Sequence, residues 1–376
     1  MARLRDTLAL DPDRQDPAAD QESVPQWLEA GSLMEDETHA EEARFQAGIV
    51  VDTHLHTMDY LPGLASSAYR WIIRRTVPPP FFLDQLPSAG VDVAVANAVG
   101  DRVATAWWGR SPWHAIEEQL ARIRAEANRA GAVVATSAAQ IRQSFESGRT
   151  AVVLGLEGAD GIGTELGRLD QLFNLGVRIA IPVHLRDNQI GTTCLPWDSY
   201  IGLPAISRRR KSGLTDFGRA VIERMNSLGM IIDVSHADAT TLHDVAKCSD
   251  QPIVATHSGA RKIEDFKRYL DDAEIALIAG SDGIVGLWPY HYGGHGPRDL
   301  DALMRHARYI ADLVGPKHLC VGTDINGVPG MLAGFRAERD VRLVAESLQS
   351  SGFSEQETAD IMGGNFMRVF EHVAPG

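Results

Sequence analysis

The sequence predicts an α/β fold in which eight parallel strands close into a (β/α)8, or TIM, barrel. Eight short runs of mainly β-branched and apolar residues recur after residue 48, and each is apolar throughout rather than alternating. That pattern is typical of parallel strands buried on both faces. Helical patterns separate most of the runs over roughly 325 residues, a length that suits one barrel. The predicted strands are Ile49–Asp52, Val91–Val95, Ala151–Leu156, Arg178–Val183, Met230–Val234, Pro252–Thr256, Gly283–Trp288 and Leu319–Gly322.

The clearest predicted helix is Asp216–Leu228. Thr215 precedes it as an N-cap, and Gly229 follows it as a C-cap that adopts a left-handed conformation easily. An open, doubly wound sheet is the alternative architecture, but the GxGxxG and GxxxxGKS/T phosphate loops that would favour it are missing from the sequence. The other predicted helices are Glu117–Ala130, Asp299–Val314 and Glu338–Leu348.

Composition and charge predict an acidic globular protein with a distinct N-terminal segment. Of 376 residues, 44% are hydrophobic and 23% are charged, and 36 basic residues against 50 acidic ones give a formal net charge of −14. This surplus of negative charge disfavours binding to nucleic acid or to an anionic membrane surface. Residues 1–47 are rich in Asp, Glu, Gln, Pro and Ala, so we expect an acidic extension, partly helical or flexible, before a barrel domain over 48–376.

The cysteine pattern and the lack of export signals favour a cytoplasmic location. Cys194, Cys248 and Cys320 are few, odd in number and far apart, so we expect neither a disulfide framework nor a CxxC pair. The N-terminal segment has no apolar core of signal-peptide length, and no apolar run approaches the ~20 residues that a membrane helix needs. We therefore expect a soluble, cytoplasmic protein.

Side chains that bind metals or move protons follow six of the eight predicted strands. In a barrel, functional side chains gather at the carboxyl ends of the strands, so we expect these residues to share one site. His54 and His56 are two positions apart on one strand and can therefore face one ion together. The full set is His54, His56, Glu157, His184, His236, His257 and Asp324.

These donors predict a metal centre. Imidazoles and carboxylates suit zinc or a similar first-row metal. Without His184, six donors remain, which exceed the four that one tetrahedral zinc needs and favour two ions about 3.5–4 Å apart that share a carboxylate. Any one of these histidines alone would more simply be a hydrogen-bonded structural residue. Six other histidines are expected on the surface, and two could line the pocket: His39, His114, His243, His306, His318 and His372, and then His291 and His295.

Several segments carry a family resemblance. They are GLTDFG (213–218), MNSLGMIIDVSH (225–236), PIVATHSGAR (252–261), VGTDINGV (321–328) and GGNFMRVF (363–370). In this order they resemble the membrane (renal) dipeptidase family, whose members are binuclear zinc peptidases of the amidohydrolase superfamily. The resemblance spans residues 49 to 373 and is most specific in the second half.

The resemblance implies a role for each side chain by its position. His184 would contact the scissile carbonyl and its oxyanion, and Arg268 would bind the terminal carboxylate of the substrate. For Arg268, a surface arginine beside Lys267 is the alternative. The implied zinc ligands are His54, His56 and Asp324 for the first ion, Glu157 as the bridge, and His236 and His257 for the second ion.

One position departs from the family pattern. The first motif of the family is His-x-Asp, and here His56 stands in place of the aspartate. An imidazole in place of a carboxylate removes one negative charge, which should acidify bound water further and weaken the attraction for the metal. Asp59 could compensate if its loop bends inward. His-x-His is also the pattern of the wider amidohydrolase superfamily, so we expect metal binding to be kept.

The predicted function is hydrolysis of a small amide, most simply a dipeptide, by a hydroxide that bridges two zinc ions. Asp324 would act as general base and then as general acid. The alternatives are an amidohydrolase that cleaves an N-acyl amino acid, a lactam or another small amide, and an inactive homologue that serves as a binding protein. The expected partner is a dipeptide or other small molecule, with no nucleic acid and no membrane, and a homodimer is compatible with a barrel enzyme.

Overall fold

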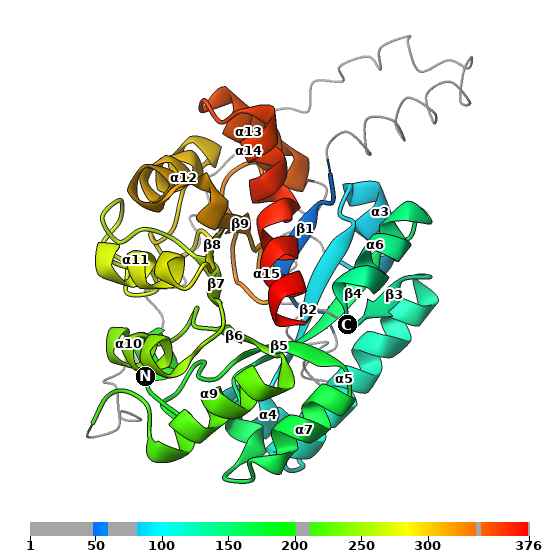
Figure 1. The fold of residues 1–376 in the computed structure, drawn as a ribbon, viewed down its shortest axis with the longest axis vertical. Coiled ribbons are helices and arrows are strands. Elements are labelled where there is room, and N and C mark those ends of the chain that lie inside the picture. Colours follow the sequence, from blue (N-terminus) through cyan, green and yellow to red (C-terminus); the bar gives the residue numbers. More distant parts are fainter. Residues whose placement is uncertain (1–47, 59–80, 201–210, 336–339, 375–376) are drawn as a thin grey trace, which may run out of the picture. The chain divides into compact units, whose positions relative to one another are not determined.

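A parallel sheet that curls toward closure forms the centre of the protein, and it confirms the predicted (β/α)8 barrel (Figure 1). The computed structural model describes residues 48–58, 81–200, 211–335 and 340–374. Within them the strand order is β1-β2-β4-β5-β6-β7-β8-β9. The strands are β1 (Val51–Leu55), β2 (Val93–Val99), β4 (Ala151–Glu157), β5 (Val177–Ile181), β6 (Ile231–Asp233), β7 (Ile253–Ser258), β8 (Ile284–Leu287) and β9 (Leu319–Val321).

The last strand returns to the first just beyond the regular sheet. The backbone N–H of Asp324 donates to the carbonyl of His54 at 2.7 Å, and the N–H of His56 donates to the carbonyl of Ile325 at 3.1 Å. These bonds join the end of β1 to the segment that follows β9. Two sets of predicted ligands, far apart in the sequence, are therefore fixed to each other through their own backbones.

One short strand, β3 (Val133–Ala135), was not predicted. It pairs with the first half of β4, from Ala151 to Val153, whereas β5 pairs with the second half, from Leu154 to Glu157. A run of three residues between two helices is too short for its apolar pattern to identify a strand. β3 therefore extends the sheet at the amino end of β4 without adding to the barrel order.

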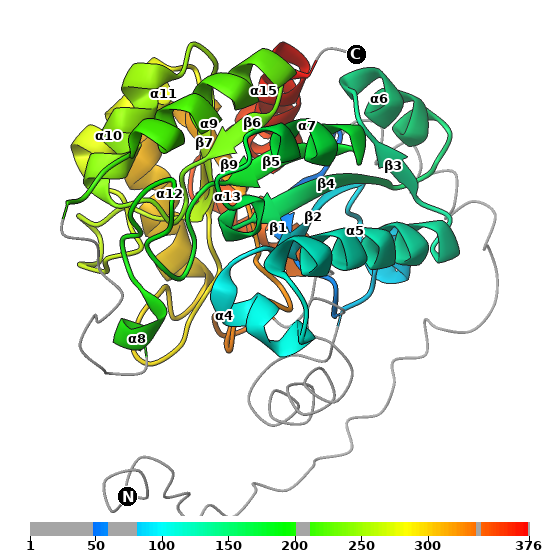
Figure 2. The same ribbon diagram turned by 90° about the horizontal axis from the view of Figure 1, so that it is seen from below.

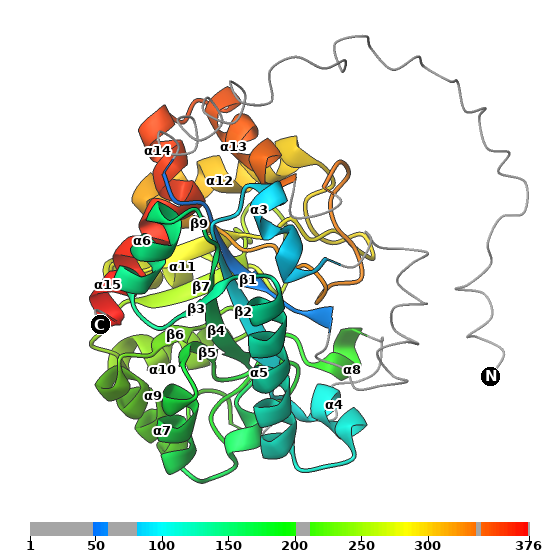
Figure 3. The same ribbon diagram turned by 90° about the vertical axis from the view of Figure 1, so that its right-hand side faces the viewer.

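Helices cover the outside of the barrel, as Figures 1 and 2 show. In Figure 3, α5 runs beside β2, with which it is in contact. The helices are α3 (Leu86–Ala89), α4 (Arg102–Thr105), α5 (Pro112–Arg129), α6 (Ala138–Glu146), α7 (Gly167–Asn174), α8 (Trp197–Tyr200), α9 (Asp216–Leu228), α10 (Ala239–Cys248), α11 (Asp272–Gly280), α12 (Leu300–Val314), α13 (Val341–Ser350), α14 (Glu355–Ala359) and α15 (Asn365–Val373).

The helix predicted most clearly has the predicted bounds and caps. In α9 the Thr215 hydroxyl accepts the N–H of Gly218 at 2.8 Å, and Gly229 closes the helix at a φ of 74°. Three further predictions, the 1–47 extension, His39 and Asp59, lie outside the described residues. Among the helices that the structure describes, none combines the length and apolarity needed to cross a bilayer.

The strands separate two apolar layers. Leu154 of β4 belongs to the outer layer, which also contains Ile116 and Leu120 of α5. Val153, the residue before it, belongs to the inner layer, which contains Phe370 of α15. Because neighbouring residues of a strand point to opposite faces, this assignment fixes which side chains face the barrel interior. The inner layer fills the amino end of the barrel and leaves its carboxyl end to polar side chains.

Two of the histidines predicted on the surface are buried. His306 of α12 is 3% exposed, and its Nδ1 accepts the N–H of Ala260 at 3.0 Å. His318 is 4% exposed, and its Nδ1 lies 2.8 Å from the carbonyl oxygen of Gly283. His306 lies three residues after the buried Leu303, on the inner stripe of its helix, so helical spacing could have identified it. His243 and His372 are exposed as predicted, and His114 is partly exposed.

Replacing His306 by Asn should make folding stability less sensitive to acid. Burial lowers the pKa of His306 from 6.5 to about 4, so below pH 6.5 the unfolded chain binds a proton that the folded chain excludes. The stability contributed by the neutral imidazole is present above pH 6.5 and is lost toward pH 4, by about 3 kcal/mol. An asparagine amide can still accept the Ala260 N–H without titrating.

Denaturant unfolding at pH 7 and pH 4 measures this difference. The His306→Asn variant should lose less stability than the parent protein, whereas His243→Asn, at an exposed position, should behave like the parent. An equal loss of unfolding free energy between pH 7 and pH 4 in all three proteins would contradict a buried, neutral imidazole at His306.

Candidate metal centre and active site

A bulge in β1 turns two predicted ligands into the barrel. Between Val51 and Leu55, β1 uses one residue more than β2, its partner strand. Val51 faces the inner layer, and without the extra residue Leu55 would do the same. With it, Leu55 packs in the outer layer, and His54 and His56 point to the centre of the barrel. The bulge therefore decides whether the His-x-His pair can reach the site.

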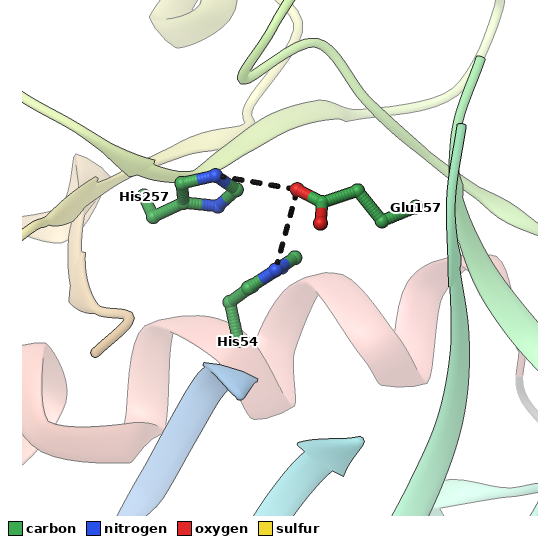
Figure 4. Close-up of side chains that lie close together, drawn as sticks. All are labelled: His54, Glu157 and His257. Atoms are coloured by element: carbon green, nitrogen blue, oxygen red, sulfur yellow. Dashed lines mark ion pairs between the residues drawn. The ribbon is translucent and has the colours of Figure 1, made fainter. Parts of the chain in front are cut away.

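Glu157 lies at the centre of the predicted set. It is the last residue of β4. It lies four residues after Val153, so the two side chains are on the same face of the strand. Its Oε1 lies 3.5 Å from Nε2 of His54, 3.1 Å from Nε2 of His236 and 3.6 Å from Nε2 of His257. Figure 4 shows His54 and His257 directed at this oxygen. Three predicted ligands, each from a different strand end, therefore surround one carboxylate oxygen.

The second oxygen of Glu157 faces a different group. Oε2 lies 3.1 Å from Nε2 of His56 and 3.5 Å from Nε2 of His184. Asp324 lies beside this group, with Oδ1 3.4 Å from Nε2 of His56 and 4.0 Å from Nε2 of His54. The structure therefore brings together all seven predicted strand-end residues, and Glu157 stands between two sets of donors.

The donor atoms fit bound metal ions. Oε1 of Glu157 is buried and accepts no hydrogen bond from the residues that the structure describes. Imidazole nitrogens also face each other, at 3.3 Å between Nε2 of His54 and His56 and at 3.1 Å between Nε2 of His236 and His257. Converging lone pairs and an unsatisfied buried carboxylate are the environment that a cation stabilises. Triads of candidate ligands are His54–Glu157–His257, His54–His56–Asp324 and Glu157–His184–His236.

Burial and mutual contacts shift the pKa values of these groups. Burial lowers the pKa of His54 to about 3, which leaves its imidazole neutral. Burial also lowers the pKa of His56, but hydrogen bonds with Asp324 and Glu157 outweigh it and raise that pKa to about 10. Burial alone would raise the pKa of Glu157, yet the charge of His184 and a hydrogen bond with His56 hold it well below the usual range. Glu157 is therefore ionised, and a metal ion bound by Nε2 of His56 would have to displace a proton from it.

Outer contacts orient two of the imidazoles. Nδ1 of His56 lies 3.2 Å from the carbonyl oxygen of Asn97, and Nδ1 of His184 lies 2.6 Å from Oδ2 of Asp101. A carbonyl and a carboxylate both accept, so Nδ1 carries the proton and Nε2 faces the centre. The other oxygen of Asp101 caps α4 by accepting the N–H of Val103 at 2.6 Å.

The site also contains Asn97 and Asp101, which the sequence pattern did not identify. The second strand was predicted to end at Val95, whereas β2 continues to Val99. With the longer strand, Asn97 falls on the inner face and Asp101 follows a strand end like the other site residues. Gly155 of β4 makes room for Asn97, because a Cβ at Gly155 would lie 2.0 Å from Oδ1 of Asn97.

The turn after β9 holds Asp324 in a conformation that few residues adopt. Asp324 has a φ of 54° and Asn326 a φ of 65°. The Asn326 amide donates to the carbonyl of His56 at 2.8 Å, which ties this turn to the other edge of the site. Gly327 is required by space, because a Cβ there would lie 2.2 Å from Oδ1 of Asp324 and 2.5 Å from Cδ2 of His56.

Arg268 is buried beside the centre rather than on the surface. Its Nη2 lies 3.0 Å from Nε2 of His236, and Nη1 donates to the carbonyl of Ser235. The guanidinium lies 4.9 Å from the ring centroid of Trp288, a residue that also packs edge-on against His257. The surface alternative for Arg268 is therefore wrong. Of the two pocket histidines considered, His295 stacks on Phe266, outside the ligand set.

Solved structures of similar fold come from several bacterial enzymes. A probable dipeptidase from Pseudomonas aeruginosa has a TM-score of 0.73 and 21% identity, over 91% of this chain and 99% of that chain. A metallopeptidase from Rhodobacter sphaeroides, solved with a phosphinate mimic of the dipeptide L-Ala-D-Ala, has a TM-score of 0.72 and 22% identity, over 87% of this chain and 99% of that chain. An amidohydrolase from Pseudomonas aeruginosa has a TM-score of 0.70 and 20% identity, over 89% and 99%. These similarities establish the shared barrel fold.

A family model provides the assignment. The model for the membrane dipeptidase family, peptidase family M19, matches residues 88–375. The match begins after β1, so it includes Glu157 and every later site residue but not the His54–His56 pair. It covers most of the chain and agrees with the barrel found in the dipeptidase structures. The chain belongs to the membrane dipeptidase family.

Proposed function

We propose that this protein is a metal-dependent dipeptidase whose site holds two zinc ions bridged by Glu157. The observation that supports the proposal best is the position of this carboxylate, with one oxygen toward His54, His236 and His257 and the other toward His56 and His184. Zinc ions bound there would supply Lewis-acid polarisation of an amide carbonyl and would lower the pKa of a water molecule.

Asp324 and His184 would supply proton transfer and oxyanion binding. Asp324, a proposed ligand of the first ion, is buried, and burial raises the pKa of its carboxyl, so it can take a proton from water and return it to the departing amine. His184 presents Nε2 to the centre while Asp101 holds Nδ1. Although burial opposes it, the charges of Glu157 and Asp101 raise the pKa of His184, which favours the N–H that an oxyanion needs.

Arg268 would select substrates that end in a carboxylate. Its guanidinium lies beside His236, one of the proposed ligands, and over the face of Trp288. A planar guanidinium can bind a carboxylate through two parallel hydrogen bonds. An amidohydrolase of other small amides would use the same ligands without this contact, and an inactive homologue would bind metal weakly. The experiments below separate these alternatives.

Gly327→Ala should weaken binding of one of the two zinc ions. The added methyl group would displace Asp324 and His56, the proposed ligands of the first ion, and leave the ligands of the second ion in place. Loss of ligand positioning typically lowers metal affinity about 10-fold or more. Zinc titration against a chromophoric chelator measures both binding steps. Gly280→Ala is the control, because a Cβ there meets nothing within 4 Å, and equal affinity in both variants would contradict the proposed first site.

Arg268→Met should raise KM for free dipeptides about 10- to 100-fold, the value of a hydrogen-bonded charge contact, and change it little for C-amidated dipeptides. Arg268→Lys keeps the charge but loses the paired donors, so it should be intermediate. The panel includes N-acyl amino acids and dipeptides with a D-residue at the second position. Preferred cleavage of amidated or N-acylated compounds by the parent protein would favour the other amidohydrolase activity.

Asp324→Asn should abolish most turnover while much of the zinc remains bound. An amide oxygen can still face the metal but cannot carry the proton, and loss of a general base lowers kcat on the order of 100-fold or more. Metal content by elemental analysis and kcat on the best dipeptide are measured on the same sample. A kcat near that of the parent protein would exclude the proton-transfer role.

A further inference from the structure

A second bulge places two consecutive side chains of β7 in the site. Between Ala255 and Ser258, β7 uses one residue more than its neighbour β8. In a regular strand Thr256 and His257 would face opposite sides. Here Oγ1 of Thr256 contacts Nδ1 of His54, and Nε2 of His257 faces Glu157 (Figure 4). Both side chains of the pair are fully buried.

The proton of the Thr256 hydroxyl is committed to Asp233 of β6. Thr256 Oγ1 donates to Oδ2 of Asp233 in a short hydrogen bond. Asp233 also accepts the N–H of Ser235 at 2.9 Å and its hydroxyl at 2.5 Å, so the carboxylate is surrounded by donors. A hydroxyl has one proton and two lone pairs. With its proton directed at Asp233, Thr256 can only accept from its other neighbours.

Two of those neighbours are imidazoles of the metal centre. Oγ1 of Thr256 lies 3.3 Å from Nδ1 of His54 and 3.1 Å from Nδ1 of His257. Because the hydroxyl oxygen must accept, each Nδ1 carries a proton, and each Nε2 keeps its lone pair. Those are the nitrogen atoms that face Oε1 of Glu157, at 3.5 and 3.6 Å.

One contact could have reversed the state of His54. The amide nitrogen of Asn97 lies 3.2 Å from the same Nδ1 atom. It also lies 3.3 Å from the carbonyl oxygen of Leu55 and 3.2 Å from that of Val95. A side-chain amide has two protons to donate. The two carbonyl oxygens can only accept, so one proton goes to each of them. The protons of Asn97 are thus used, and Nδ1 of His54 is left to donate to Thr256.

We propose that Thr256, oriented by Asp233, is a positioning residue that holds His54 and His257 in the Nδ1–H tautomer and so prepares one ligand of each proposed zinc ion. The inference rests on the metal centre of the proposed function and adds a shared support for both ions. His236 differs, because its Nδ1 has no hydrogen-bond partner among the residues that the structure describes. One hydroxyl therefore supports two strands of the site at once.

The test compares Thr256→Val with Thr256→Ser and Thr53→Val in the full chain. Valine keeps the shape of threonine without the hydroxyl, and serine restores the hydroxyl. Thr53 is a matched control, because its buried hydroxyl lies 3.1 Å from the carbonyl oxygen of Thr256 and 2.9 Å from that of Val321, has one proton to donate to either, and contacts none of the imidazoles. Zinc titration against a chromophoric chelator should show both binding steps weakened about 10-fold or more in Thr256→Val, with the other two variants near the parent protein.

A second measurement needs no metal. In the metal-free protein, ¹⁵N NMR of the imidazoles should report Nδ1–H for His54 and His257, and Asp233→Asn should shift both toward a mixture of tautomers, because an amide can donate to Thr256 and free its proton for an imidazole. Unchanged tautomers in Asp233→Asn and Thr256→Val, or a loss limited to one zinc step, would overturn the inference. If the parent protein binds no zinc, the proposed function fails instead.

Discussion

The structure of the site depends on one buried carboxylate, Glu157, placed among the imidazoles of five histidines. An ionised carboxylate inside a protein is costly unless positive charge or hydrogen-bond donors meet it. Oε1 accepts no hydrogen bond among the described residues, and the three imidazoles that face it, those of His54, His236 and His257, are neutral because burial lowers their pKa values, so they cannot compensate its charge. The chemistry of this position therefore calls for cations. Most features of the carboxyl end of the barrel position Glu157 and the histidines around it.

Two β-bulges, one in β1 and one in β7, direct the side chains into the site. A regular strand alternates its side chains, so His54 and Leu55 exchange faces if one residue is removed from β1. In β7 the extra residue lets Thr256 and His257 both face the site. The bulged strands meet where Oγ1 of Thr256 contacts Nδ1 of His54. The apolar inner layer at the amino end, closed by Phe366 and Phe370 of α15, provides the rigid base on which these irregular ends rest.

The barrel and the candidate ligands could be predicted from the sequence because both leave local signals. A strand buried on both faces is continuously apolar, and a candidate metal ligand interrupts that run at its carboxyl end, as Glu157 and His257 do. The supporting residues leave no such signal. Asn97, Asp101 and Thr256 act only through strand register, bulges and side-chain direction, which depend on pairing between distant segments. His306 shows a different failure, because its helical spacing was readable but its polarity suggested the surface.

Charge connects the unusual His56 to the choice of substrate. With two zinc ions bound as we propose, Glu157 and Asp324 leave a formal charge of +2 before Arg268 is counted, where a carboxylate at position 56 would leave +1. The pKa of His56 is raised to about 10, so its imidazole holds a proton near neutral pH. Metal binding must displace that proton. A centre with this excess of positive charge attracts anions in a buried, low-dielectric setting. A substrate that ends in a carboxylate, such as a free dipeptide, brings a negative charge to Arg268, and a neutral amide does not, so the imidazole at position 56 favours substrates that carry a carboxylate.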